Sequence, residues 1–129
     1  MDYKIIAAVA VGGAIGSVAR FVTSKIALYF FGGLLPWGTL MVNILGAFII
    51  GLCVEWMALR HGAFSNVHAF LVVGILGGYT TFSSLAMEIG LMIERNELMQ
   101  AFLYGFMTFG LGLTALFIGI YAGKLVTGN

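Results

Sequence analysis

A polar, glycine-rich stretch interrupts one of the most apolar regions of this sequence, and its residue types suit an ion site. Residues 74–85 read Gly-Ile-Leu-Gly-Gly-Tyr-Thr-Thr-Phe-Ser-Ser-Leu. Glycine and hydroxyl residues form helices poorly, so Gly77-Gly78 followed by Thr80-Thr81 predicts a break. Within lipid, a break is tolerated only where the backbone is buried in protein or lines a cavity. Such interrupted segments are typical of ion or substrate sites in transport proteins.

Other apolar segments carry polar side chains at helical spacing. Thr39 and Asn43 are four residues apart and share one helix face, as do Tyr104 and Thr108. The Asn43 amide is either a hydrogen bond between helices or a donor aimed at an anion. The Tyr104 and Thr108 hydroxyls have the same two interpretations, and we favour a line of donors along a pathway.

Four residues at and after the break extend this polar set. Thr81, Ser84 and Glu88 fall on neighbouring turns of a helix. A carboxylate within a membrane span is rare and indicates function, although Glu88 could also form an ion pair at a helix end. Phe82 either packs or presents its electropositive ring edge to an anion.

The sequence gives no indication of an enzyme. His61 and His68 have no Cys or acidic partners at the spacing of a metal site. Nucleophile–base pairs, phosphate loops and dinucleotide fingerprints do not occur. The single Cys53 lies in an apolar run and is expected to pack as a buried thiol.

The composition is that of an integral membrane protein. Of the 129 residues, 61% are hydrophobic and 9% are charged, against about 25% charged in soluble domains. The net charge of +1 predicts no nucleic-acid partner. A single transmembrane domain over residues 1–129 is expected, with each span near or above the ~20 residues that cross a bilayer. The four predicted helices cover about residues 5–31, 37–59, 67–92 and 98–126.

The basic residues are balanced between the two sides of this topology. An even number of spans puts both termini on one side, with Lys4, Arg60 and Lys124; the other side has Arg20, Lys25 and Arg95. The positive-inside rule needs an excess of basic residues to select an orientation. We therefore predict insertion in both orientations and an antiparallel homodimer with its two-fold axis in the membrane plane. The alternative is a single orientation set by another factor.

The first span combines a packing face with a basic residue. Gly12, Gly13 and Gly16 have the spacing of a close helix–helix contact. Arg20, one turn further on, either anchors the helix at the interface or faces a water-filled vestibule.

Taken together, these motifs make the chain similar to the Fluc (CrcB) fluoride channels over essentially its whole length. The second span carries Trp-Gly-Thr-x-x-Val-Asn, ending at Asn43, and the third carries Gly-x-x-Gly-Gly-x-Thr-Thr-Phe-Ser from Gly74, with Glu88 beyond it. The first span carries Gly-Gly-x-x-Gly-x-x-x-Arg, and the fourth carries Tyr104-x-x-x-Thr108.

The resemblance implies an all-α membrane protein with a broken third helix that forms an antiparallel, dual-topology homodimer with two pores. Such a channel exports fluoride passively across the bacterial cytoplasmic (inner) membrane and lowers its cytoplasmic concentration. The resemblance also implies a structural Na⁺ at the dimer centre, held by backbone carbonyls of Gly77 and Thr80 from both subunits. The implied fluoride pathway comprises Asn43, Phe82, Leu85, Tyr104 and Thr108, with Ser84 and Thr81 as further candidates. The implied vestibule residues are Arg20, Thr39 and Glu88.

One residue departs from the family pattern. Phe82 matches the first of two family phenylalanines, whereas the second position is Leu85. Leucine has no electropositive ring edge. Either the remaining donors suffice, or conduction is impaired, or the chain is an engineered variant, or it is one half of a heteromeric pair.

Two other functions are compatible with a short four-span chain. A small dual-topology, proton-coupled exporter of organic cations would need a central carboxylate, for which Glu88 is the one candidate. A membrane scaffold without transport activity is the other, and the predicted break argues against it because an unneeded break is costly in lipid.

Overall fold

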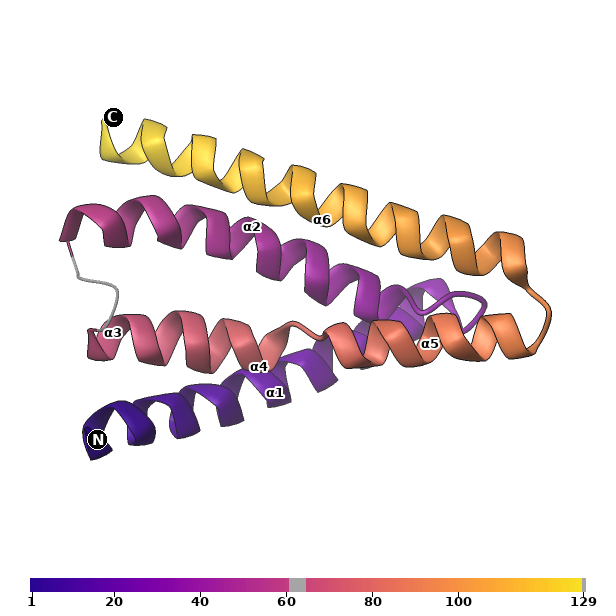
Figure 1. The fold of residues 1–129 in the computed structure, drawn as a ribbon, viewed down its shortest axis with the longest axis horizontal. Helices are drawn as coiled ribbons and strands as arrows, with labels where there is room; N and C mark the ends of the chain where they lie inside the picture. Colours follow the sequence, from indigo (N-terminus) through magenta and orange to yellow (C-terminus); the bar gives the residue numbers. More distant parts are fainter. Residues whose placement is uncertain (61–64, 129) are drawn as a thin grey trace.

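The computed structural model describes residues 1–60 and 65–128, which form an elongated all-helical bundle (Figure 1). Four helical segments in the described part are long and apolar enough to cross a membrane, which confirms the four predicted spans. The first, second and fourth segments are α1 (Tyr3–Phe31), α2 (Trp37–Arg60) and α6 (Leu98–Thr127). The third comprises α3 (Asn66–His68), the π-helix η1 (Ala69–Leu76), α4 (Gly77–Tyr79) and α5 (Phe82–Glu94).

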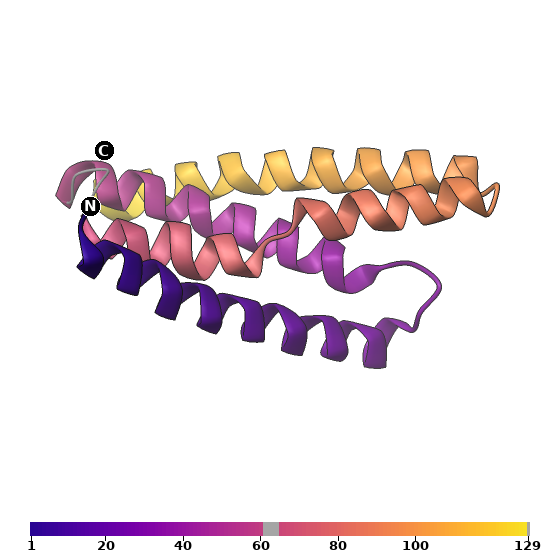
Figure 2. The ribbon, with the colours of Figure 1, turned by 60° about the horizontal axis from the view of Figure 1, so that its bottom comes forward.

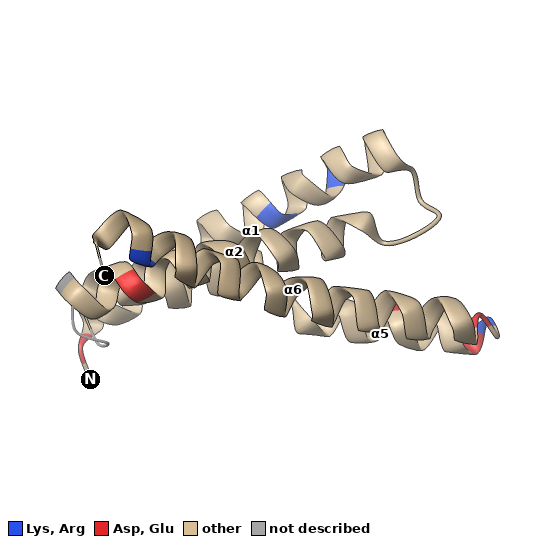
Figure 3. Ribbon diagram, turned by 90° about the horizontal axis from the view of Figure 1, so that it is seen from above, with Lys and Arg blue, Asp and Glu red and all other residues tan. Residues whose placement is uncertain are grey.

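Both chain termini lie at the same end of the bundle (Figure 1). The Asp2 side chain caps the first turn of α1 by accepting the Lys4 amide. Gly32, with φ of 74°, ends that helix, because its amide returns to the Leu28 carbonyl in a left-handed conformation that glycine adopts without strain. Figure 3 shows acidic and basic residues at both ends of the bundle and further basic residues part-way along α1.

The third span changes partner along its length. Its first part, η1 and α4, packs against α1, whereas α5 packs against α6. Between them the chain leaves the helical path (Figure 2). Thr80 and Thr81 are extended, with ψ of 158° and 117°, whereas Gly77 is still helical. The residues that interrupt the helix are therefore the two threonines, not the glycines before them.

Glycines allow backbones to approach closely where α1 meets the third span. A Cβ atom added to Gly16 would collide with the Ile75 carbonyl and lie 2.9 Å from the Tyr79 nitrogen. A Cβ atom added to Gly13, on the same helix, would meet nothing within 4 Å. A Cβ atom added to Gly12 would likewise collide with the Phe70 carbonyl. Two positions of the predicted glycine face, Gly12 and Gly16, therefore tolerate no side chain, whereas Gly13 does.

Gly16→Ala is expected to lower the free energy of unfolding by ~1–3 kcal/mol, because overpacking a tight contact forces the helices apart. Thermal unfolding of the purified protein in detergent measures this change, and Gly13→Ala is the matched control. Equal unfolding temperatures for the two variants would contradict the close contact at Gly16.

Candidate functional site

Asn43 of α2 forms hydrogen bonds with the backbone at the interruption of the third span. The Asn43 Nδ2 donates to the Thr81 carbonyl at 3.0 Å, and the Thr81 amide donates to Asn43 Oδ1 at 2.8 Å. Thr81 is buried, so without this carboxamide its backbone groups would lack a protein partner at the break. A carboxamide has two N–H donors, and this pairing commits one of them.

A hydroxyl cluster begins α5 directly after the interruption. The Thr81 Oγ1 accepts the Ser84 amide at 3.2 Å, which is a helix N-cap. The same Oγ1 lies 3.2 Å from Ser84 Oγ, to which it donates, and 3.3 Å from Ser83 Oγ. Thr81 and Ser84 were predicted as candidates from the sequence, whereas Ser83, which shares the cluster, was not.

Thr80, at the interruption, and Tyr79, just before it, contact α2 and α1. The Thr80 amide and hydroxyl both donate to the Leu76 carbonyl, at 3.0 and 2.9 Å. Gly46 of α2 leaves room for the Thr80 methyl group, with which any Cβ there would collide. Tyr79 forms a hydroxyl–hydroxyl hydrogen bond of 3.1 Å with Thr23 of α1. Tyr79 and Thr23 were not predicted, because no motif or spacing relates them.

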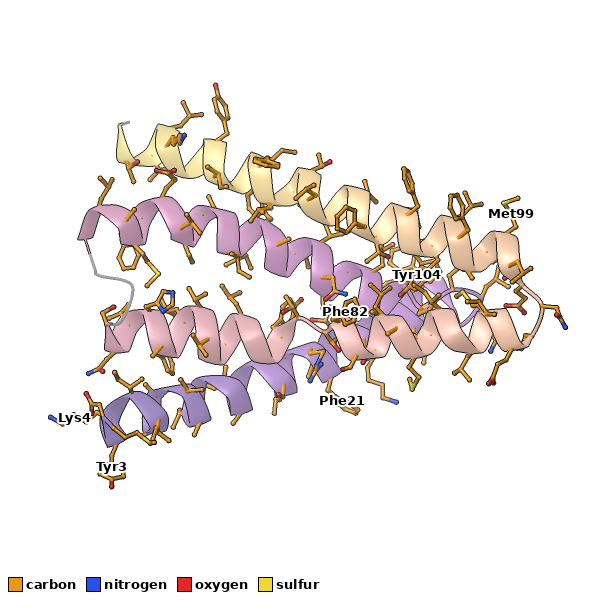
Figure 4. The ribbon with its side chains drawn as sticks, in the orientation of Figure 1. Tyr3, Lys4, Phe21, Phe82, Met99 and Tyr104 are labelled. Atoms are coloured by element: carbon orange, nitrogen blue, oxygen red, sulfur yellow. The ribbon has the colours of Figure 1, made fainter. Side chains whose placement is uncertain are left out.

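A cavity of about 380 Å³ lies beside the interruption. Its lining includes five residues predicted for the pathway, namely Asn43, Thr81, Phe82, Leu85 and Thr108. Figure 4 shows Phe82 beside the interruption, and its side chain is 81% exposed in the single protomer. The structure thus brings together residues from three spans around one mostly apolar space.

Glu88 lies in a second polar cluster. The Thr39 hydroxyl donates to Glu88 Oε1 at 2.6 Å, and the Tyr104 hydroxyl donates to Glu88 Oε2 at 2.8 Å. Such charge-assisted hydrogen bonds are the stronger kind. Among the side chains that the structure describes, the ion pairs are Arg95–Glu97 and Lys124–Glu55, so the alternative of an ion pair for Glu88 is not found there. Two hydroxyl groups stabilise this carboxylate instead.

This second cluster borders a cavity of about 310 Å³ near the connection between α1 and α2. Thr39, Ser84 and Glu88 line it, together with Ser24 of α1, which was not predicted from the sequence. Arg20 is partly buried on α1, and within the described residues its guanidinium makes no hydrogen bond or ion pair. Thr39 and Glu88 thus meet at this cavity, and the vestibule roles of Thr39, Glu88 and Arg20 stay predictions.

The Tyr104 and Thr108 hydroxyls of α6 both donate hydrogen bonds to acceptors in the same protomer. Thr108 donates to the Tyr104 carbonyl at 2.8 Å, and Tyr104 donates to Glu88. Tyr104 is only 2% exposed and points inward from α6 (Figure 4). To serve as donors to an anion, both hydroxyls would have to exchange these hydrogen bonds. Their role as donors to an anion stays a prediction, and it requires that these hydrogen bonds be exchanged.

Backbone carbonyl groups are the candidate ligands for the predicted cation in the part of the chain that is described. Groups of three or more His, Cys, Asp or Glu residues are not found there; His61 lies outside the described residues. Carbonyl groups at the end of α4 have lost the amides that continue a helix. Such oxygens are the hard ligands that small cations such as Na⁺ prefer, and Gly77 and Thr80 are therefore compatible with the predicted ligand set.

Comparison with known proteins shows to which family this chain belongs. The family described as "CrcB-like protein, Camphor Resistance (CrcB)" matches residues 7–120. The chain belongs to the CrcB family. Proteins named fluoride-specific ion channel FluC in Agrobacterium fabrum and a Caulobacter species are 43% and 42% identical to it over 119 residues. That alignment covers 92% of this chain and 95% and 93% of those two proteins. The FluC protein of Allorhizobium ampelinum is 39% identical over 116 residues, which cover 90% of this chain and 93% of that protein.

Membership of the CrcB family confirms the resemblance inferred from the motifs. The named CrcB relatives are ion channels rather than enzymes, in agreement with the expectation of no catalytic function. With its four apolar helices, the chain is a multi-pass membrane protein. The proton-coupled exporter considered above is not favoured, because these relatives carry the name of a channel.

Proposed function

We propose that this protein is a fluoride-selective channel that exports fluoride passively and lowers its concentration in the cytoplasm. The observation that carries the proposal is the cavity at the interruption, where Asn43, Phe82 and Thr108 meet, in a chain whose relatives are named fluoride-specific channels. Four apolar spans and a bacterial set of relatives support placement in the cytoplasmic (inner) membrane.

Fluoride is small and strongly hydrated, so a pore must replace its water with donors along the path. The second N–H of Asn43, the hydroxyls of Ser83 and Ser84, and the ring edge of Phe82 lie near the start of α5 and could serve as donors. The narrow spacing of these groups would reject chloride. Glu88 would act at the entrance, where hydrogen bonds from Thr39 and Tyr104 partly offset its charge.

The channel is proposed to work as an antiparallel homodimer with two pores. A single protomer leaves the aromatic rings of Phe82, Phe106 and Phe109 81%, 71% and 72% exposed. A second copy packed in the opposite orientation would cover part of this surface and close the cavity. The balanced basic residues support insertion in both orientations.

A structural Na⁺ is proposed at the centre of this dimer. The Gly77 and Thr80 carbonyls of both subunits would hold it, which requires the helical interruption that frees carbonyl oxygens. When bound, the cation would supply fixed positive charge between the two anion paths.

Fluoride efflux from liposomes that contain the purified protein tests the proposed function. We expect fluoride release recorded by a fluoride electrode, with no matching release of chloride. Chloride release at the same rate would contradict selectivity. Efflux that needs a proton gradient, measured in fluoride-free liposomes with organic cations, would instead support the exporter.

Leu85→Phe is expected to raise the rate of fluoride efflux by about threefold, because a second ring edge adds an aromatic contact of ~0.5–1.5 kcal/mol to the pathway. Leu85 lines the cavity of about 380 Å³, which has space for the larger side chain. Leu85→Met is the control, since it is similar in volume and has no ring. Equal rates for both variants would show that the second ring is dispensable here.

A further inference from the structure

The hydrogen bonds at the interruption follow a pattern that relates two side chains to two particular carbonyl groups. In a continuous α-helix each carbonyl accepts the amide four residues ahead. The partner of the Gly77 carbonyl would be the Thr81 amide, and the partner of the Thr80 carbonyl would be the Ser84 amide. Both of these amides are taken by side chains in the structure.

The first amide is captured across the helix interface. Thr81 donates its backbone N–H to Asn43 Oδ1 at 2.8 Å, while Asn43 Nδ2 holds the Thr81 carbonyl at 3.0 Å. This two-point contact links α2 to a residue 38 positions further along the chain. The Gly77 carbonyl thereby loses the amide that a continuous helix would bring to it.

The second amide is captured locally. Ser84 donates its backbone N–H to Thr81 Oγ1 at 3.2 Å, so the Thr80 carbonyl loses its helical partner as well. The preceding turn behaves differently, because the Leu76 carbonyl keeps the Thr80 amide at 3.0 Å. The first carbonyl group to lose its helical amide donor is therefore that of Gly77. This is one of the two carbonyl groups proposed to bind the cation.

We propose that Asn43 and Thr81 are positioning residues of the cation site, because their side-chain oxygens capture the amides that would otherwise occupy the Gly77 and Thr80 carbonyls. The inference rests on the Na⁺ site of the proposed function. It gives Asn43 a second role besides donating to fluoride, and it couples the anion path to the cation site through one side chain.

The competition explains why side-chain oxygens are needed. An amide and a carbonyl left unpaired in lipid cost several kcal/mol, so they would pair with each other and restore the helix. Side-chain acceptors stabilise the amides and leave only the carbonyls in need of a partner. A bound cation satisfies carbonyl oxygens but cannot satisfy amides, so these acceptors and the cation complement one another.

Two matched pairs of variants test the inference. Thr81→Val removes the capturing oxygen at constant shape, and its β-branched side chain suits the extended backbone, whereas Thr81→Ser keeps the oxygen. Asn43→Leu removes the acceptor of the Thr81 amide, whereas Asn43→Asp keeps an oxygen at that position. The readout is the thermal unfolding temperature of the full-length protein as NaCl replaces N-methylglucamine chloride.

We expect the Na⁺ concentration at half-maximal stabilisation to rise by about fivefold or more in Thr81→Val and Asn43→Leu, as expected when one hydrogen bond is gained by the competing state. Thr81→Ser and Asn43→Asp should stay within about twofold of the unaltered protein, because each keeps its capturing oxygen. An equal Na⁺ response in all five proteins would overturn the inference and leave the cation site standing. A complete lack of Na⁺ response in the unaltered protein would overturn the cation site and the inference together, while fluoride selectivity would still be judged by efflux.

Discussion

Asn43→Ala is expected to reduce fluoride efflux by about 100-fold, since the buried Thr81 amide and carbonyl would lose their partners at a cost of ~1–3 kcal/mol each. The same change removes the carboxamide of Asn43, a residue that lines the cavity, and with it the N–H donor proposed for fluoride. Initial rates of fluoride release from proteoliposomes, normalised to the amount of reconstituted protein, measure the effect.

Asn66→Ala is the control for this experiment. Asn66 is exposed at the start of α3, so the same truncation there should leave the efflux rate unchanged. If Asn43→Ala conducted like Asn66→Ala, neither the donor role nor the positioning role of Asn43 would hold.

Tyr104→Phe is expected to have the second-largest effect. It deletes a hydroxyl that donates to Glu88 Oε2 at 2.8 Å while keeping the ring, which is 2% exposed. A hydrogen bond to a charged group contributes ~1.5–3 kcal/mol, so the free energy of unfolding should fall by about that amount. Fluoride efflux should fall by about tenfold, because the Glu88 carboxylate then repels the anion with less compensation.

The matched control is Tyr121→Phe, which removes the same atom from a side chain that is 64% exposed on α6. Chemical denaturation in detergent and fluoride efflux are compared for both variants. Retention of unaltered stability and flux by Tyr104→Phe would mean that the Thr39 hydroxyl alone suffices for Glu88.

Local sequence features predicted the region of the interruption but not the residues that form it. Glycine and hydroxyl residues indicated a break near Gly77–Thr81, and the extended residues are Thr80 and Thr81. Helix propensity cannot separate these positions, because a glycine costs only ~1 kcal/mol within a helix. The deciding interaction is the Asn43 carboxamide, which pairs with Thr81 and with no glycine.

For the polar residues on α6, the sequence predicted the helix face but not the hydrogen-bond acceptors. Their spacing correctly places Tyr104 and Thr108 on one helix face, and both are buried in the structure. Spacing does not reveal which acceptor takes each hydroxyl proton. Tyr104 donates to Glu88 from α5, with the Pro36 carbonyl as a longer second acceptor at 3.4 Å, and Thr108 donates to the Tyr104 carbonyl.

The sequence by itself determined the membrane setting, the four spans and the family, because hydropathy, segment length and local motifs are properties of neighbouring residues. The tertiary structure alone decided which polar groups meet. Asn43 pairs with a residue 38 positions away, and Thr39 pairs with one 49 positions away. Such pairings depend on how rigid helices pack against one another, and no periodicity along a single helix encodes that arrangement.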